Sequence, residues 1–419
     1  MNPDNMTNNL KPESIIGLEI HVELNTKTKL FCACPTQGSA EPNTRTCPVC
    51  FGHPGSKPVV NRKAVEKTLA VCAALGCTIA PQLVFSRKSY FYPDMAKNYQ
   101  ITQYELPLGT SGVLAIGEKK VRIRRVHLEE DPASITYPGT IAGSRYVLVD
   151  YNRSGNPLCE IVTEPDLTSP EEARTFMKEL ITLLDTLNVF DVKDGLIKAD
   201  CNISVRESGY TRVEIKNVSG FKEIERALEY ETARQRQGVR EGEAFLQHTR
   251  AWDAGAGKTI LLRTKETEED YGYIIDPDLV PVEITPALLD RIAKNLPELP
   301  QKKEARFVKE YGLSSDDAHV LSHDKKLSML FEQTAQSVEP LLAARWVREE
   351  VMRVVNYHKL EDWKFDITHF ADLLRLVAER KITETVAKEL LEKLLLDDYD
   401  VRAYVEKKGL EAVSDAGEL

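Results

Sequence analysis

Residues 17–24, GLEIHVEL, alternate strictly between apolar and polar positions. Because successive side chains of a β-strand point to opposite faces, this pattern predicts a strand with Leu18 and the other apolar residues on one face. The opposite face carries Glu19, His21 and Glu23. Two carboxylates and an imidazole on one face can form a site for a hard cation or for acid–base chemistry. A half-exposed strand with a solvated polar face fits the same spacing, so both interpretations stay open for this segment.

The same alternation recurs further along the chain. The predicted strands span residues 119–128, 147–160 (two strands around a turn), 199–205 and 214–217. The first of these has a basic face and runs into three acids, residues 129–131, which could hold a divalent cation or form an exposed turn. Strands that repeatedly place polar side chains on one face predict a sheet or cradle whose concave face is a polar cavity.

Helical periodicity marks the remaining scaffold. Residues 61–75 and 169–187 predict helices that begin at the N-caps Asn61 and Ser169, the second with Glu172 completing a capping box. From Thr285 the alternation stops and helical periodicity continues, for example over residues 346–352 and 386–396. The pattern therefore predicts an α+β fold, with a β-rich part up to residue 284 followed by an all-α part.

Four of the eight cysteines lie at the spacing of metal ligands. They form CAC and CPVC pairs separated by a loop rich in proline, glycine and serine or threonine: Cys32, Cys34, Cys47 and Cys50. Four thiolates fill the tetrahedral sphere of Zn²⁺, which predicts a structural zinc knuckle; four separately buried thiols are the alternative. The other cysteines are expected to be small core residues.

Composition limits the class of protein. The 419 residues carry a net charge of −10, so a partner with a phosphate backbone must meet a local basic patch. The chain contains no run of 18 apolar residues, and its polar N-terminus, expected to fray, is not a secretory signal. Cysteines at metal-ligand spacing fit a cytoplasmic protein. Residues 87–99 interleave basic residues with tyrosines, which suits phosphates and stacked bases or, equally, an aromatic core corner.

Seven long motifs in a fixed order carry a family resemblance. They are GLEIHVEL, CAC…CPVC, RKSYFYPD, HLEED, DYNRSGNPLCEIVTEPDL, KADCNISVR and EIKNVSGF. Together they resemble the B subunit of the tRNA-dependent amidotransferase GatCAB over essentially the whole chain. The resemblance implies a cradle domain over residues 1–284 with the zinc knuckle at 32–50, a helical domain over 285–395, and the start of a truncated tail domain over 396–419.

The resemblance also implies a reaction. ATP phosphorylates the side-chain carboxylate of Glu-tRNA(Gln) or Asp-tRNA(Asn), and ammonia then converts it to the amide. Glutamine supplies the ammonia in a separate amidase (glutaminase) chain, the A subunit of the complex. The other expected partners are the small C subunit, misacylated tRNA and a non-discriminating aminoacyl-tRNA synthetase. The expected cofactors are ATP, Mg²⁺ and structural Zn²⁺, and the enzyme is a cytoplasmic carbon–nitrogen ligase.

Site residues follow from the matching motifs. The implied catalytic residues are Glu19, His21, Glu130, Glu160 and Asp200. Of these, His21, Glu130 and Glu160 are the implied Mg²⁺ ligands, His21 acting directly or through water. The implied gate of an ammonia channel consists of Lys88, Lys97 and Glu130. The implied contacts of ATP or the acceptor end are Tyr90, Asn152, Arg153, Asn202, Lys216 and Asn217.

Two rival interpretations accompany this one. The first is a non-catalytic, zinc-bearing scaffold that binds tRNA without ATP. The second is the paralogous B-like chain of the archaeal two-subunit amidotransferase, which carries an inserted domain for which this chain has no room before Thr285. Residues 271–278, YGYIIDPD, depart from the arginine and Phe-Pro-Glu stretch of many family members, so no role of that arginine is carried over.

Overall fold

The computed structural model describes residues 12–139, 144–191, 197–264, 271–361 and 363–411. The chain forms two compact units, Met1–Pro297 and Glu298–Leu419, which are described separately. The expected fraying of the N-terminus falls mainly on residues outside the described ranges, as does the last part of the expected tail. The domain boundaries expected from the sequence stay a prediction.

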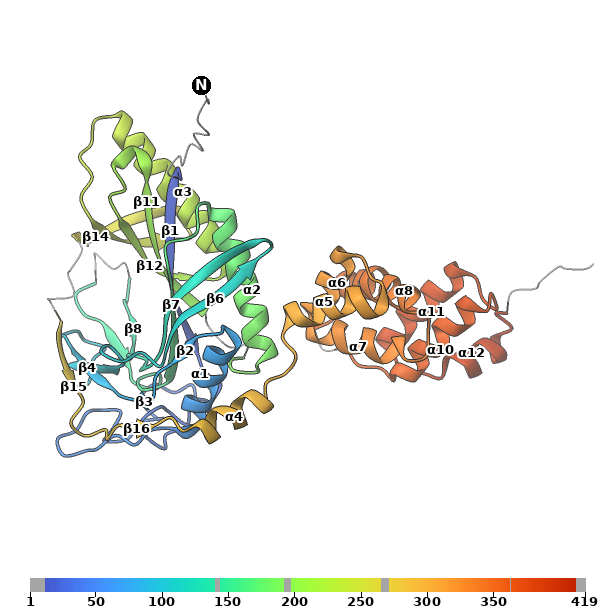
Figure 1. Cartoon of the computed structure of the whole chain (residues 1–419), viewed down its shortest axis with the longest axis horizontal. Coiled ribbons are helices and arrows are strands. Elements are labelled where there is room, and N and C mark those ends of the chain that lie inside the picture. Colours follow the sequence, from blue (N-terminus) through green and yellow to red (C-terminus); the bar gives the residue numbers. More distant parts are fainter. Residues whose placement is uncertain (1–11, 140–143, 192–196, 265–270, 362, 412–419) are drawn as a thin grey trace, which may run out of the picture. The chain divides into compact units, whose positions relative to one another are not determined.

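A nine-stranded sheet organises the first unit (Figure 1). Across the sheet the strands are β14 (Lys258–Thr264), β13 (His248–Asp253), β12 (Val213–Ser219), β11 (Ile197–Val205), β1 (Ser14–Glu23), β10 (Pro157–Thr163), β7 (Lys119–Glu130), β6 (Gly109–Ile116) and β2 (Thr78–Ile79). Neighbouring strands run antiparallel except β12 and β13. The strand predicted at residues 17–24 is therefore β1, in the middle of the sheet.

The alternation in β1 decides which face of the sheet is the core. Ile16, Leu18, Ile20 and Val22 are at most 1% exposed, and the residues between them are half-buried. Three helices pack on the sheet: α1 (Arg62–Ala74) on β7 and β6, α2 (Pro170–Thr186) on β6, and α3 (Phe221–Arg240) on β11 and β12. The polar side chains of β1 lie on its other face.

The predicted caps of α1 and α2 are present. The Asn61 side chain accepts from the amides of Lys63 and Ala64, and Ser169 Oγ accepts from the amide of Glu172. The Glu172 carboxylate accepts from the amide of Thr168 at 2.7 Å, one residue before the position that a capping box would use.

Three small sheets complete the β-structure of the first unit. β15 (Gly272–Ile275), β4 (Ser86–Ser89) and β5 (Tyr99–Thr102) form one of them, and β5 packs on β7. The others pair β16 (Val282–Glu283) with β3 (Gln82–Leu83) and β8 (Ser134–Thr136) with β9 (Leu148–Asp150). A 3₁₀ turn, η1 (Arg206–Ser208), follows β11, and helix α4 (Pro286–Lys294) packs on α1.

The described residues of the second unit form helices without strands. They are α5 (Pro300–Tyr311), α6 (Ser315–Ser322), α7 (Lys325–Ala335), α8 (Pro340–Arg345), a π-helical segment (Trp346–Val351), α9 (Met352–His358), α10 (Ile367–Ala378), α11 (Glu384–Leu396) and α12 (Val401–Lys408). Their core includes Phe307, Phe331, Trp346 and Phe370, each at most 1% exposed. The mixed helix and strand content predicted from the sequence is confirmed.

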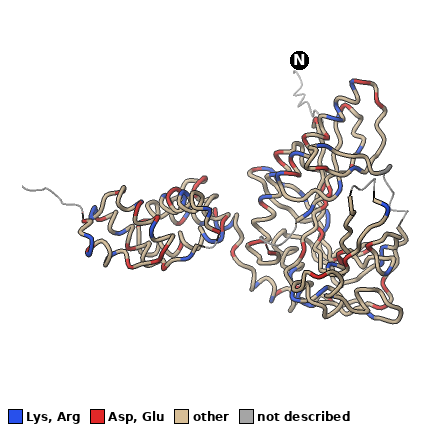
Figure 2. Tube along the Cα trace, turned by 180° about the vertical axis from the view of Figure 1, so that it is seen from behind, with Lys and Arg blue, Asp and Glu red and all other residues tan. Residues whose placement is uncertain are grey.

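Among the described residues, no helix is both long and apolar enough to span a membrane. Acidic and basic residues are interspersed along the traces of both units (Figure 2).

Candidate functional site

Strand register brings four side chains together on the polar face of the large sheet. His21 of β1 pairs with Glu160 of β10, and Glu160 pairs with His127 of β7. His21 Nε2 lies 3.4 Å from a carboxylate oxygen of Glu160 and 3.6 Å from one of Glu129. His127 Nε2 lies 3.3 Å from Glu160 and 3.6 Å from Glu129. Two imidazoles thus bracket two carboxylates.

Three members of this group have the geometry of a cation site. His21, Glu129 and Glu160 each offer one ligand atom, and these atoms lie within 4.8 Å of one another. Glu129 and Glu160 are 5% and 7% exposed, and Thr102 Oγ1 donates to Glu129 at 3.0 Å. Buried carboxylates beside an imidazole suit a divalent cation.

Burial and charge shift the pKa values of this group. Burial alone would lower the pKa of His21, but the hydrogen bond and charge of Glu160, with Glu129, raise it to about 10. Burial likewise opposes the charge of His127, and Glu160 and Glu129 raise its pKa to about 9. Burial would raise the pKa of Glu160, but the two imidazoles hold it well below its usual value. At neutral pH the cation-free site therefore pairs the ionised carboxylate of Glu160 with two imidazolium ions.

A second acidic group lies beside the first. A bulge in β12, where Lys216 and Asn217 lie between the partners of Ala199 and Cys201, places both residues opposite Asp200 of β11. Asp200 accepts from Lys216 Nζ at 2.6 Å and from the amide of Asn217 at 2.8 Å. Burial would lower the pKa of Lys216, but Asp200 and Glu214 raise it. The ammonium of Lys216 thus offsets part of the negative charge of Asp200 and Glu214.

One cavity of about 290 Å³ is lined by residues of both groups, among them His21, Glu129, Glu160 and Asp200. Of the predicted site residues, the cavity lining includes Glu19, His21, Lys88, Tyr90, Arg153, Glu160, Asp200, Lys216 and Asn217. Lys88 Nζ lies 4.5 Å from the centre of the Tyr271 ring. Carboxylates, imidazole and several cations around one hollow can bind a metal-bound polyphosphate.

Glu130 lies elsewhere, on the other side of β7. Its carboxylate accepts from the amide of Ile101 at 2.8 Å and pairs with Lys97. The sequence assigned to Glu130 the place beside His21 and Glu160 that Glu129 occupies in the structure. The reason is an extra residue of β7, Arg124, in its pairing with β10, which puts Arg125, His127 and Glu129 on the polar face.

The shift has a signal in the sequence. Alternation through Val121 and Ile123 resumes one position late, at Val126 and Leu128, all four being fully buried. Because those residues share the core face, His127 and Glu129, which alternate with them, must lie on the opposite, polar face. The sequence pattern includes Glu129 and Asp131 in a trio of acids that could hold a cation. The site residues that the family resemblance implies include neither of them, nor His127 or Glu214.

Two predicted contact residues have other partners. Asn152 is 2% exposed; its side-chain amide donates to the carbonyl of Glu41 at 2.7 Å and accepts from the backbone amide of Arg45 at 2.7 Å. Asn202 Nδ2 donates to Glu19 at 3.0 Å. Asn152 therefore holds the loop between the cysteine pairs, and Asn202 holds Glu19.

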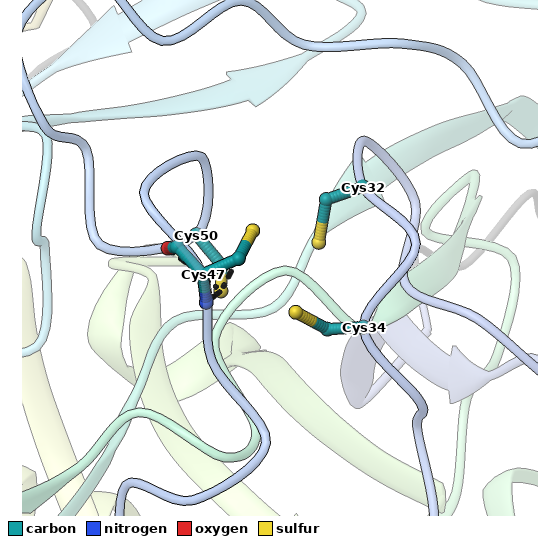
Figure 3. Close-up of side chains that lie close together, drawn as sticks. All are labelled: Cys32, Cys34, Cys47 and Cys50. Carbon is teal, nitrogen blue, oxygen red and sulfur yellow. Dashed lines mark hydrogen bonds between the residues drawn. The ribbon is translucent and has the colours of Figure 1, made fainter.

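The four predicted zinc ligands converge (Figure 3). The Sγ atoms of Cys32, Cys34, Cys47 and Cys50 lie within 4.8 Å of one another. The Sγ atoms of Cys47 and Cys50 are 3.9 Å apart, close to the roughly 3.8 Å edge of a tetrahedron with Zn–S bonds of about 2.3 Å. A hydrogen bond from Cys32 lowers the pKa of Cys50 to about 5, with Lys29 acting in the same direction. The cluster fits a zinc ion.

Comparison with known proteins gives a consistent result over nearly the whole chain. Residues 14–290 match the family described as the GatB/GatE catalytic domain, and residues 329–419 match the GatB domain. The B subunit of the aspartyl/glutamyl-tRNA(Asn/Gln) amidotransferase of Clostridium beijerinckii is 42% identical over 422 residues, covering 97% of this chain and 88% of that protein. The B subunit of the same name from Thermus thermophilus is 44% identical, covering 97% of this chain and 87% of that protein. The one from Methanospirillum hungatei is 47% identical, covering 92% of this chain and 81% of that protein.

Proposed function

The chain belongs to the family of the B subunit of aspartyl/glutamyl-tRNA(Asn/Gln) amidotransferases, and from this premise we propose that its cavity activates a carboxylate attached to tRNA. ATP phosphorylates the side chain of Glu-tRNA(Gln) or Asp-tRNA(Asn), and ammonia replaces the phosphate. The observation that carries the proposal is the convergence of His21, Glu129 and Glu160 in one cavity with Lys88, Arg153 and Lys216.

The chemistry explains why such a site is needed. A carboxylate oxygen is a poor leaving group, so ammonia does not displace it. Transfer of the γ-phosphoryl group of ATP to that oxygen gives an acyl phosphate and ADP. The nitrogen of ammonia then bonds to the carbonyl carbon, the C–O bond to phosphate breaks, and the amide forms with loss of one proton. A Mg²⁺ ion, when bound, would neutralise charge on the transferring phosphate.

The residues of the chain divide this work among them. His21, Glu129 and Glu160 would hold the cation, and the donor set of two carboxylates and one imidazole fits it. Arg153 and Lys88 offer charge-assisted hydrogen bonds to phosphate oxygens. Lys216 keeps Asp200 and Glu214 paired, so that a polyphosphate meets less negative charge.

Ammonia would reach the cavity past the Lys97–Glu130 ion pair. The side chains of this pair are 13% and 6% exposed, and Gln100 Nε2 donates to the carbonyl of Glu130 at 2.8 Å. The pair is thus held between β5 and β7, next to the cavity lining at Gln100. The amidase partner would supply glutamine-derived ammonia within a complex that also contains the small partner chain, and the four cysteines would hold zinc as a structural ion.

The test uses the complex assembled with its amidase and small partner chains. Glu129→Gln should lower ATP-dependent amidation of Glu-tRNA(Gln) and Asp-tRNA(Asn), with ammonium chloride as the nitrogen source, by about 100-fold or more. Binding of tRNA should be unchanged. Glu118→Gln, an exposed glutamate in the turn between β6 and β7, is the matched control. Full activity of Glu129→Gln would contradict the proposal and favour a scaffold that binds tRNA without chemistry.

A further inference from the structure

Lys29 is a lysine without exposed surface. Its side chain is 0% exposed, and its Nζ donates to the carbonyl of Tyr151 at 3.1 Å. Its amide donates to the carbonyl of Cys34 at 2.9 Å, so the residue lies directly at the start of the cysteine loop. A buried ammonium is strongly unfavourable unless negative charge lies nearby.

The four-cysteine cluster, with zinc bound, would supply that charge. Four thiolates around Zn²⁺ leave about two net negative charges. Lys29 Cδ and Cys50 Cβ lie 3.6 Å and 3.7 Å from the position that a Cβ on Gly155 would take. Lys29 and Cys50 therefore flank the same glycine, and the Lys29 ammonium donates to the carbonyl of Tyr151, which precedes that glycine in the same turn.

Gly155 joins the cysteine loop to the reaction cavity. Its φ of +86° is a left-handed conformation that favours glycine. Its carbonyl accepts from the amide of Leu30 at 2.8 Å, and its amide donates to the carbonyl of Asp131 at 2.8 Å. Ser154 Oγ, beside it, donates to the carbonyl of Cys50 at 3.3 Å. The turn over residues 151–156 thus touches the cysteine loop on one side and the end of β7 on the other.

This turn carries part of the cavity wall. Arg153 pairs with Asp131, with one bond at 2.6 Å, and both side chains line the cavity. Asn156 Nδ2 donates to Glu23 at 2.7 Å, and Glu23 also lines the cavity. The position of this wall therefore depends on the backbone of the turn.

The loop between the two cysteine pairs forms hydrogen bonds with Val149 and Asp150, which lead into the turn, and with Asn152 within it. Asn43 Nδ2 donates to the carbonyl of Val149 at 3.2 Å, and the Asn43 amide donates to Asp150 at 2.9 Å. Asn152 binds the same loop through Glu41 and Arg45. Since that loop is closed by the four cysteines, an ordered metal site and an ordered turn support each other.

We infer that Lys29 is a positioning residue, which ties the four-cysteine metal site to the turn that presents Arg153 to the cavity. The metal knuckle then acts as a brace for one wall of the reaction site. The functional consequence rests on the proposed phosphoryl transfer, whereas the coupling of the knuckle to the turn does not.

Hydrogen–deuterium exchange on the full chain tests the coupling without any reaction. Lys29→Met keeps the apolar stem and removes the ammonium. It should keep about one zinc per chain while the amides of Gly155 and Asn156 exchange about tenfold faster or more. Lys27→Met, an exposed lysine two residues earlier, is the matched control and should change neither. Exchange within threefold of the unaltered chain, or loss of zinc from Lys29→Met, would overturn the assignment.

Metal removal is the second arm and does not depend on the variant folding. A chelator that strips zinc from the unaltered chain should speed exchange over residues 151–156 while leaving α2 protected. Unchanged protection of the turn in the zinc-free chain would overturn the inference.

A double-mutant cycle in the assembled complex tests the consequence for function. Lys29→Met should raise KM for ATP severalfold, and the same substitution should add little to Arg153→Ala. Independent, multiplicative effects would overturn the positioning role. Accelerated exchange in a complex that shows no ATP-dependent phosphorylation would instead refute the proposed function and leave the coupling intact.

Discussion

If His21, Glu129 and Glu160 hold a divalent cation as proposed, the pKa of His21 makes that binding depend on pH in a calculable way. In the cation-free chain burial disfavours the imidazolium, but Glu160 and Glu129 outweigh burial and raise the pKa to about 10. An imidazole must be neutral to coordinate a metal, so a cation has to displace this proton. Below pH 10, therefore, protons compete with the cation for the site.

The magnitude follows from this competition. If one proton leaves per cation bound, affinity rises about tenfold per pH unit, or about 100-fold between pH 7 and pH 9. His127, with a pKa raised to about 9 against the opposing effect of burial, also faces both carboxylates. Partial loss of its proton would make the rise steeper, not shallower.

Isothermal titration with Mn²⁺ or Mg²⁺ on the full chain measures both quantities. Titration in buffers of different ionisation enthalpy should give release of about one proton per cation at pH 8. His21→Asn keeps the carboxylates, loses the titrating ring and should flatten the dependence to that of His127 alone. An affinity in the unaltered chain that stays within threefold from pH 7 to pH 9 would refute coordination by His21.

Three further predictions concern single side chains. Lys216→Met should lower the free energy of unfolding, measured by urea denaturation, by about 2 kcal/mol, because it leaves Asp200 buried without its cation; the loss is moderate because a third of the lysine side chain is exposed. Adding Asp200→Asn to Lys216→Met should recover part of this loss, and purely additive losses of the two substitutions would contradict the pairing. Cys50→Ser should reduce zinc, measured by mass spectrometry, well below one per chain, whereas full occupancy would exclude the four-cysteine site. Glu130→Gln should leave the Mn²⁺ affinity within about threefold of that of the unaltered chain, because this carboxylate faces Lys97 and not the proposed cation site. If Glu130→Gln lowered the Mn²⁺ affinity as much as Glu129→Gln does, the assignment of Glu130 as a ligand made from the sequence would be restored.

Local pattern was sufficient to predict much of the scaffold. The alternation around Glu19 and His21 predicted the central strand, because burial of one face of a sheet imposes a period of two. The caps at Asn61 and Ser169 and the clustering of the four cysteines follow equally from short-range chemistry. The resemblance supplied the residues that converge from distant strands, such as Glu160, which spacing alone does not place beside His21.

The side-chain placements that differ from the expectation depend on bulges in the strands, which the alternation does not show by itself. One extra residue of β7 at Arg124, relative to β10, placed Glu129 and not Glu130 beside His21 and Glu160. A second bulge gave Asp200 its partner on β12. Asn152 was expected at the ligand, but its partners lie in a loop more than a hundred residues earlier, and such tertiary contacts have no signature in its neighbourhood.

The central claim is that His21, Glu129 and Glu160 bind one divalent cation. Anomalous diffraction from crystals soaked in Mn²⁺ tests it directly. The account predicts a peak about 2.0–2.3 Å from His21 Nε2 and from one carboxylate oxygen each of Glu129 and Glu160. A fully soaked crystal without that peak, or with manganese at Glu130 instead, would contradict it.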